Sequence, residues 1–362
     1  MINKLPRRFL IQQVVIPDYR MRFFLDLTKA LDAESLEVIA GVEDFNITPK
    51  SSELAWKHFL KTRNTFLFRR KFLWQNIVLK SLSYEKVILN ANTRIISNWA
   101  ILIIRRLLFK KTYLWGHTIG KNKAFNILKL LFISMGNAYI CYTNDQKSGL
   151  IHSLPSHQVF SAPNACLSSD ECFSYPQAEE NLDTIVYVGR LISEKKAILL
   201  IKAFKHISEN NLLDRDIKLK IVGEGYEGEN LKRFVANAKL SNIQFVGHIN
   251  STEKLREIYS KAFASVSPGY VGLSATQSFA FGVPMAVSRD EKHSPEIEAC
   301  IESYNTKYFD TDNYESLASV IAEFYKERPY WQKQRDSISK WTRENYSFES
   351  MVKTFKNVLL DL

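Results

Sequence analysis

The sequence has few cysteines for its length. Four of its 362 residues are cysteines, and they are too scattered to form a disulfide framework. Cys166 and Cys172 have no His or Cys partner at the spacing of a zinc site. We therefore expect reduced thiols, as is usual in a cytosolic protein.

The chain also lacks an uncharged apolar run long enough to cross a bilayer. Its most apolar stretch, residues 99–109, is interrupted by Arg105 and Arg106, whereas a spanning helix needs about 20 predominantly apolar residues. The first residues, Met1 to Arg8, precede only a short apolar run and do not resemble a signal peptide. We expect a cytoplasmic protein that, at most, lies on the inner face of the cell membrane.

Positive charge is abundant and unevenly placed. The formal net charge is +11, and the whole excess lies within residues 1–169. The first half should therefore face an anionic partner. The length exceeds what one hydrophobic core normally supports, so two domains are expected.

Short apolar runs alternate with longer segments of helical period in both halves of the chain. Examples are the predicted strands Lys86 to Asn90 and Thr184 to Val188, and the predicted helices Arg20 to Leu31 and Ala197 to Ser208. Such alternation predicts doubly wound α/β domains with parallel sheets. A polar segment marks the linker, which gives an N-terminal domain (1–167), a linker (168–182), a second domain (183–343) and a C-terminal helix (344–362) expected to pack on the first domain.

The loop after the predicted strand 184–188 carries two cations. Gly189 ends the strand, and Arg190 and Lys195 follow before the next helix. A forked guanidinium and a compact ammonium at the carboxyl end of a parallel strand can hold a diphosphate. The alternative is that these residues are solvent-exposed cations of an ordinary βα loop without a binding role.

Three more glycine-containing segments follow. Residues 221–225 and 245–248 each end a strand at a glycine, where the backbone can approach a flat ligand such as a nucleobase. Residues 267–284 form a loop that leads into a short helix near Ser274, whose free amides could bind an anion while Gln277 binds ribose hydroxyls. The alternative is a plain helix with Ser274 as N-cap. The candidate donor contacts are Gly189, Gly223, Gly247, His248, Gly272, Leu273, Ser274 and Gln277.

In this order the segments resemble the donor-binding domain of family 4 glycosyltransferases, the group 1 glycosyl transferases. The resemblance implies the GT-B fold, an α/β architecture of two Rossmann-like doubly wound domains facing each other across a cleft. It also implies a nucleotide-sugar donor, no cofactor and retention of anomeric configuration. Arg190 and Lys195 would neutralise the departing diphosphate without a metal ion, because Asp310-Thr-Asp312 lies after the donor motifs.

The chain departs from this family at the positions of its paired glutamates. Gly269 and Gln277 stand there instead, so a carboxylate near the donor sugar is missing. The family's Gly-Gly-x-Pro-Glu becomes Lys292-His-Ser-Pro-Glu296. His293 and Glu296 are therefore added as donor-sugar contacts.

The basic first half carries the remaining candidates. Residues 61–80 mix aromatic residues with cations, as interfacial helices do, although a solvated helix face is the alternative. The predicted membrane-facing residues are Arg69, Arg70, Lys71, Arg105 and Arg106. No motif of a nucleic-acid reader is present, so no nucleic-acid partner is expected.

His117 follows the predicted strand 112–115 and could bond the donor sugar or orient the acceptor. It joins Arg190 and Lys195 as a catalytic candidate, although a loop-capping role is the alternative. Tyr19 and Arg20, in the first strand–helix loop, are the candidate acceptor contacts.

The sequence thus predicts a retaining, metal-independent hexosyltransferase of bacterial cell-surface glycan synthesis. It would use a UDP-sugar in preference to a GDP-sugar, and a glycan or polyprenyl-diphosphate-linked acceptor at an anionic membrane surface. One alternative is a catalytically inactive scaffold that binds nucleotide-sugar or membrane. The other is a nucleotide-sugar epimerase of the same fold, which would require carboxylates that Gly269 and Gln277 do not supply.

Overall fold

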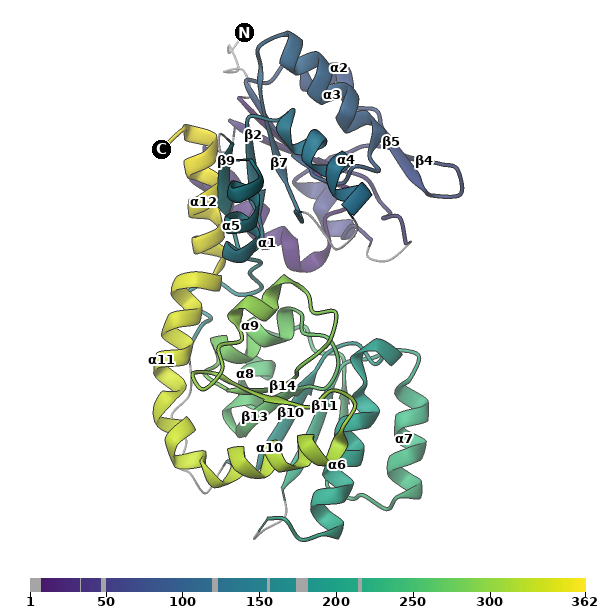
Figure 1. Cartoon of the computed structure of the whole chain (residues 1–362), viewed down its shortest axis with the longest axis vertical. Coiled ribbons are helices and arrows are strands. Elements are labelled where there is room, and N and C mark those ends of the chain that lie inside the picture. Colours follow the sequence, from purple (N-terminus) through teal and green to yellow (C-terminus); the bar gives the residue numbers. More distant parts are fainter. Residues whose placement is uncertain are drawn as a thin grey trace. The chain divides into compact units, whose positions relative to one another are not determined.

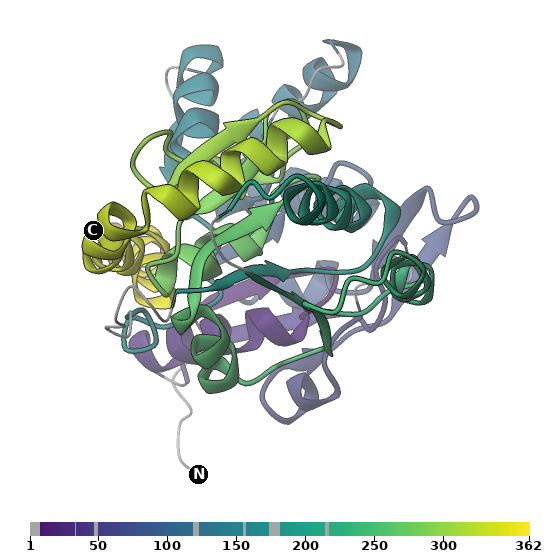
Figure 2. The ribbon, with the colours of Figure 1, turned by 90° about the horizontal axis from the view of Figure 1, so that it is seen from below.

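A computed structural model describes residues 8–32, 34–46, 50–118, 123–154, 157–173, 182–213 and 217–362 (Figures 1 and 2). The chain divides into two compact units. Unit 1 comprises Met1–Asn164 and Phe348–Leu362, and unit 2 comprises Ala165–Ser347. Of the predicted linker 168–182, residues 174–181 lie outside the described part.

Unit 1 is built on a parallel sheet in the order β3-β2-β1-β6-β7-β8-β9. Several strands are apolar runs buried along most of their length, as expected for parallel strands covered on both faces. The strands are β1 (Phe9–Gln12), β2 (Leu36–Ala40), β3 (Leu60–Lys61), β6 (Lys86–Asn90), β7 (Lys111–Trp115), β8 (Ala138–Cys141) and β9 (Gln158–Ser161).

Helices cover both faces of this sheet. On one face, α1 (Asp18–Ala30) packs beside α12 (Phe348–Leu360), and the Phe355 ring lies 5.0 Å from that of Phe23 and 4.8 Å from that of Trp115. The C-terminal helix therefore belongs to the core of unit 1. On the other face, side chains of α3 and α4 are buried against the strands. The remaining helices of unit 1 are α2 (Val78–Ser81), α3 (Ile96–Leu107), α4 (Lys123–Ser134) and α5 (Asn144–Ser153).

The segment predicted as an interfacial helix, residues 61–80, is instead largely a β-hairpin that projects from unit 1 (Figure 1). β4 (Asn64–Leu67) pairs antiparallel with β5 (Phe72–Gln75), and burial alternates along β5 as a strand requires. The chain reverses through Phe68, Arg69 and Arg70, whose φ angles of 49°, 53° and 64° lie in the left-handed region. The helix prediction was wrong because the apolar residues form two short contiguous runs, 66–68 and 72–74, rather than a helical repeat.

Unit 2 is built on a second parallel sheet, in the order β12-β11-β10-β13-β14-β15. The predicted α/β class with two parallel sheets is therefore confirmed. β15 was not predicted, and the strands are β10 (Thr184–Val188), β11 (Lys218–Val222), β12 (Ile243–Gly247), β13 (Ala262–Ser267), β14 (Met285–Ser288) and β15 (Thr306–Phe309).

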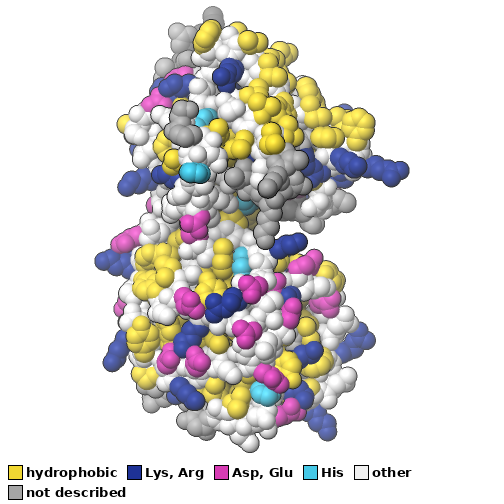
Figure 3. All heavy atoms as spheres, in the orientation of Figure 1, with side chains coloured by type: hydrophobic (Ala, Val, Ile, Leu, Met, Phe, Trp, Pro, Cys, Tyr) yellow, Lys and Arg dark blue, Asp and Glu magenta, His cyan; other side chains and the backbone are white. Residues whose placement is uncertain are grey.

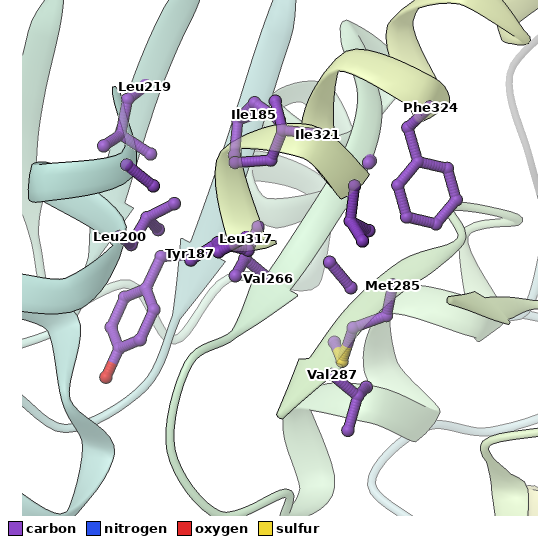
Figure 4. Packing of buried hydrophobic residues seen from close by; sticks show 14 of the residues in the cluster. Ile185, Tyr187, Leu200, Leu219, Val266, Met285, Val287, Leu317, Ile321 and Phe324 are labelled. Carbon is purple, nitrogen blue, oxygen red and sulfur yellow. The ribbon is translucent and has the colours of Figure 1, made fainter. Parts of the chain in front are cut away.

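Alternate side chains of β10 enter the two cores of unit 2. Ile185 and Tyr187 pack with Leu200 of α6 and Leu317 of α10 (Figure 4), whereas Val186 faces the cluster that includes α8. Figure 2 shows α6 and α10 on one face of the sheet and α8 on the other. The helices are α6 (Ala197–Glu209), α7 (Gly228–Asn237), α8 (Thr252–Ser260), α9 (Leu273–Ala280), α10 (Tyr314–Lys326) and α11 (Arg328–Tyr346).

No helix in the described residues is both long enough and apolar enough to cross a membrane.

Candidate active site

The glycines at the strand ends of unit 2 meet at the carboxyl edge of its sheet. The Gly189 N–H donates to the Val222 carbonyl at 3.0 Å, and the Gly223 N–H donates to the Gly247 carbonyl at 2.8 Å. Gly223 has a φ of 137°, and a Cβ there would lie 1.9 Å from the Gly189 carbonyl oxygen. The close approach of these loops therefore requires glycine at position 223.

Arg190 and Lys195 are brought together by a third residue, Tyr270. Arg190 Nη2 donates to the Tyr270 hydroxyl at 2.9 Å, and Lys195 Nζ donates to the Tyr270 carbonyl at 2.8 Å. Lys195 Nζ also lies 3.5 Å from the centroid of the Tyr270 ring. Burial, with a smaller contribution from Arg190, lowers the pKa of Lys195 to about 8. Sequence reasoning missed Tyr270, whose one signal is its place in the glycine-containing loop after β13.

The N-terminus of α9 lies beside this cation pair. The helix begins at Leu273 with Gly272 as the N-cap residue, rather than with Ser274 as the cap. A Cβ added to Gly272 would lie 3.5 Å from Lys195 Nζ. The first amides of a helix bind anions well, so Gly272, Leu273 and Ser274 lie where a diphosphate held by Lys195 could also receive backbone hydrogen bonds.

His293, which follows β14 in the chain, contacts the same loop at Val271. Its Nδ1 accepts a 3.0 Å hydrogen bond from the Val271 N–H, so the ring is neutral with its proton on Nε2. Burial lowers the pKa of His293, which favours this neutral form. Among the described residues Nε2 is buried without a hydrogen-bond partner.

The other donor candidates differ in exposure. Gln277 is half-buried on α9, and Glu296 is buried at the start of the 3₁₀ helix η4 (Pro295–Ala299), which contacts α9. His248 is exposed, and its N–H lies 3.4 Å from Glu224 Oε1. His248 is thus held through its backbone, and its ring is free in solvent.

Gly269 is enclosed by backbone. A Cβ at this position would lie 2.2 Å from the Glu194 carbonyl oxygen and 2.9 Å from Lys195 Cα. The short 3₁₀ helix η3 (Ser193–Lys195) therefore occupies the space that a side chain at position 269 would need. A glutamate at position 269 would therefore require the turn that carries Lys195 to lie elsewhere.

The candidates in unit 1 gather at the carboxyl edge of its sheet. Arg20, in the first turn of α1, is buried; its Nη2 donates to Asn164 Oδ1, and its guanidinium lies 4.9 Å from the Trp115 ring. Tyr19 is 43% exposed, which leaves its ring accessible to a ligand. The structure therefore separates an accessible residue, Tyr19, from a buried one, Arg20.

His117 follows β7, and its ring lies 4.8 Å from that of Tyr142. The residue is exposed at the surface. Partial desolvation of the ring lowers the pKa of His117, and the positive charges of Lys129 and Arg20 lower it further. Lys129, which sequence reasoning missed, lies on α4 and is buried.

Two of the five residues predicted to face a membrane are held by the protein. Arg105 is fully buried and donates to backbone carbonyls that include those of Tyr84 (3.0 Å) and Lys111 (2.8 Å), so its prediction was wrong. Arg70 is half-buried, with its guanidinium 3.7 Å from the Phe66 ring. The exposed members of the set are Arg69, Lys71 and Arg106.

Within the described residues, no cluster of three or more His, Cys, Asp or Glu side chains is placed to hold a metal ion. In the Asp310-Thr-Asp312 segment, Asp312 forms a 2.7 Å ion pair with Lys196.

Sequence comparisons place this chain among sugar-transferring enzymes. Residues 170–345 match the family model described as Glycosyl transferases group 1. The chain is 23% identical over 283 residues to an uncharacterized glycosyltransferase of Haemophilus influenzae, covering 75% of this chain and 77% of that protein. A shorter match, 28% identical over 99 residues, covers 27% of this chain and 26% of the Campylobacter jejuni protein named GalNAc-alpha-(1->4)-GalNAc-alpha-(1->3)-diNAcBac-PP-undecaprenol alpha-1,4-N-acetyl-D-galactosaminyltransferase.

Structural comparison finds the same fold in HepE of Anabaena. The crystal structure of HepE in complex with UDP has a TM-score of 0.71 at 12% identity, covering 98% of this chain and 99% of HepE. HepE in complex with UDP-glucose gives a TM-score of 0.66, also at 12% identity, over 98% of this chain and 100% of HepE. At this level of identity the likeness establishes the GT-B fold.

Proposed function

Since this chain belongs to the group 1 glycosyl transferases and has the GT-B fold, we propose that it transfers a hexosyl-type sugar from a UDP-sugar to a lipid-linked or polysaccharide acceptor. The observation that carries the proposal is the convergence of Arg190 and Lys195 on Tyr270, beside the N-terminus of α9. Two cations and a row of free helix amides are suited to the two negative groups of a diphosphate.

The base preference rests on HepE, which binds UDP and UDP-glucose in its crystal structures. In this chain the strand ends at Gly223 and Gly247 would approach the uracil, and Gln277 would accept or donate to the ribose hydroxyls. His293, Glu296 and His248 are the proposed contacts to the sugar and the base. A GDP-sugar is the competing donor.

The proposed chemistry is transfer with retention. The acceptor hydroxyl oxygen forms a bond to the anomeric carbon on the face that the diphosphate leaves. The bond from this carbon to the diphosphate oxygen breaks, its electron pair goes to UDP, and a phosphate oxygen takes the acceptor proton. Arg190 and Lys195 stabilise the negative charge that develops on UDP, while His117 of unit 1 orients the reacting hydroxyl.

The proposed acceptor surface lies on unit 1 with Tyr19 and Arg20. The name of the Campylobacter relative includes an undecaprenol-linked diphosphate acceptor, and a lipid-linked acceptor requires contact with a membrane. We therefore propose that the enzyme works on the inner face of the cell membrane, bound to its surface. Hydrophobic side chains gather over α3 and α4 (Figure 3), and we name this exposed set the α3–α4 apolar face: Ile103, Leu107, Leu108, Phe109, Ile127, Leu128 and Leu131.

Two features favour lipid as the partner of this face. Phe109 is 97% exposed and Leu107 is 73% exposed, and exposed apolar patches of this kind mark interaction surfaces. The exposed cation Arg106 lies in the same segment, and anionic head groups attract each such charge by about 1 kcal/mol.

Released UDP is the measurement that tests this function. The purified protein is incubated with UDP-glucose, UDP-galactose, UDP-N-acetylglucosamine, UDP-N-acetylgalactosamine and GDP-mannose, each with and without a lipid extract, and the nucleotide released is quantified. We expect one UDP-sugar to be consumed, and Arg190→Ala to abolish the release. Binding of UDP without release from any donor would favour the inactive scaffold.

A further inference from the structure

Arg20 and Trp115 of unit 1 each bury an N–H donor that has no acceptor in the described part of the chain. Arg20 is 8% exposed and Trp115 is 2% exposed, and the guanidinium carbon of Arg20 lies 4.9 Å from the Trp115 ring. Arg20 Nη1 and Trp115 Nε1 are both buried, and neither has a hydrogen-bond partner among the described residues. Buried polar groups are normally paired, so two orphaned donors in one cluster point to an acceptor-rich ligand.

A second buried cation, Lys129 of α4, lies at the same edge of the sheet but on the face opposite to the Trp115 ring. Lys129 is 5% exposed, and its Nζ donates to the Ala91 carbonyl at the end of β6. The Ala91 N–H in turn donates to the Trp115 carbonyl at 2.8 Å. No described carboxylate forms an ion pair with Arg20 or Lys129, and the ion pairs of unit 1 involve other cations. Two buried charges are thus left without a counter-ion, which is costly unless a ligand supplies one.

His117 lies close enough to both cations that the charge of each acts on its ring. Its ring is tilted by 54° to that of Tyr142, with 4.8 Å between the ring centroids, and the Tyr142 ring lies 5.7 Å from the guanidinium of Arg20. Its carbonyl accepts a 2.6 Å hydrogen bond from the Tyr139 hydroxyl, and the Tyr139 ring lies 6.0 Å from Lys129 Nζ. Tyr142 thus contacts both Arg20 and His117, and Tyr139 contacts both Lys129 and His117. We place His117 next to the reacting hydroxyl.

We propose that Arg20 and Trp115 bind a phosphoryl group of the acceptor beside His117, and that Lys129 adds positive charge from the other face of the sheet edge. Two fixed positive charges around a neutral imidazole match a dianion, and a phosphoryl group offers three oxygens to the several free donors, where a carboxylate offers two. The group is either the diphosphate of a lipid-linked sugar or the phosphate of a soluble sugar phosphate. The inference rests on the proposed transferase function and narrows its acceptor to a phosphorylated one.

The test uses the full chain with the donor site filled by saturating UDP. Methyl phosphate is titrated and followed by ³¹P NMR line broadening, and vesicles of phosphatidylcholine containing undecaprenyl diphosphate are used in a parallel cosedimentation experiment. We expect Arg20→Gln and Lys129→Gln to weaken binding at least tenfold. Arg22→Gln, on the same helix and paired at the surface with Asp26 at 2.7 Å, is the matched control and should bind as the wild type does.

Binding of both probes supports recognition of the phosphoryl group itself, and binding of the vesicles alone identifies the lipid-borne source. The proposal is overturned if the wild type binds neither probe, or if the Arg20→Gln and Lys129→Gln variants bind as tightly as the wild type. Arg20→Lys retains the positive charge but lacks the Nη1 donor. The circular dichroism and the UDP affinity of this variant show whether it is folded. If UDP does not bind, the donor proposal fails separately, and the titrations without UDP are judged by the same variants.

Discussion

Lys195 Nζ donates a 2.8 Å hydrogen bond to the carbonyl of Tyr270 and lies 3.5 Å from the centroid of its ring. The Tyr270 hydroxyl accepts from Arg190 at 2.9 Å. One residue of the loop after β13 thus positions both cations of the proposed diphosphate site. Positive charges that are held in place before the reaction stabilise the negative charge that develops on the departing diphosphate.

Tyr270→Phe should separate the two contacts. It removes the hydroxyl that positions Arg190 and keeps the ring and carbonyl that hold Lys195. A hydrogen bond of this kind contributes about 1 kcal/mol, so we expect UDP affinity to fall by roughly fivefold in isothermal titration. Tyr304→Phe is the control and should leave UDP affinity unchanged, because the Tyr304 hydroxyl donates to the Ser337 carbonyl at 3.0 Å and Tyr304 precedes β15, at the opposite edge of the sheet. Unaltered affinity in Tyr270→Phe would mean that the hydroxyl does not position Arg190.

The low pKa of Lys195 predicts a pH dependence. Its pKa is about 8, below the ordinary 10.5, chiefly because of burial. The ammonium therefore loses its charge as pH rises through about 8, and UDP affinity should fall from there upward, with proton uptake on binding near pH 8.5. Lys195→Arg should flatten this profile because a guanidinium stays charged. A wild-type affinity that is constant from pH 7 to pH 9.5 would contradict the assignment.

The same group has a defined effect on folding stability. Between about pH 8 and 10.5 the unfolded chain binds more protons at Lys195 than the folded chain does. Its contribution to stability therefore rises with pH in this window and is unfavourable below it. Urea unfolding of Lys195→Met against the wild type at pH 7 and pH 9.5 measures this, and the variant's relative stability should be greater at pH 7.

Restoring the family glutamate should damage the site. In Gly269→Glu, the Cβ would meet the Glu194 carbonyl oxygen at 2.2 Å. The Lys195 turn must move, at a cost of about 1–3 kcal/mol for such overpacking, and UDP affinity should fall with it. Gly149→Ala is the control, because no atom lies within 4 Å of the added Cβ. A gain in donor affinity or activity in Gly269→Glu would show that the turn adapts without loss.

Arg105 and Arg106 are neighbours in sequence with opposite expected phenotypes. Arg105 donates to several buried carbonyls, and burial lowers its pKa to about 10. Arg105→Met leaves those carbonyls unpaired and should destabilise unit 1 by more than about 3 kcal/mol. Arg106→Met, at the exposed neighbour, should change stability by less than about 0.5 kcal/mol. Urea unfolding followed by circular dichroism compares them, and equal stabilities would contradict the burial of Arg105.

The α3–α4 apolar face predicts membrane binding that depends on exposed apolar side chains. Phe109→Ser and Leu107→Ser should each weaken cosedimentation with phosphatidylglycerol vesicles, since a buried side chain of this size contributes about 1.5–3 kcal/mol. Ile301→Ser, at an exposed apolar residue of unit 2, is the matched control. Equal vesicle binding by all three variants would remove this face from the account.

Most of the fold could be predicted because parallel strands leave a strong signal in sequence. β6 and β10 have their predicted bounds, since each is a largely apolar run that ends at a change of polarity. The β4–β5 hairpin could not be separated from an interfacial helix, because its apolar residues form the contiguous runs 66–68 and 72–74, which show no period of two. β15 was missed, because Thr306 to Phe309 is short and half-buried in part.

The candidate site was less predictable than the fold. The loops around Gly189 and Gly272 could be found because glycine and cations at strand ends have a recognisable spacing. Tyr270 and Lys129 could not, because their roles depend on contacts with Lys195 and Ala91 that are distant in sequence. Arg105 was assigned to the surface from its charge, and only tertiary packing reveals that it is enclosed by carbonyls.

The most direct test of the donor site is isothermal titration of UDP into the wild type, Arg190→Ala and Arg233→Ala. Arg233 is an exposed arginine of α7 in the same unit and serves as the matched control. The account predicts that wild type and Arg233→Ala bind UDP equally, and that Arg190→Ala binds at least tenfold more weakly while its unfolding transition is unchanged. Absence of UDP binding in the wild type, or equal affinity in Arg190→Ala, would contradict it.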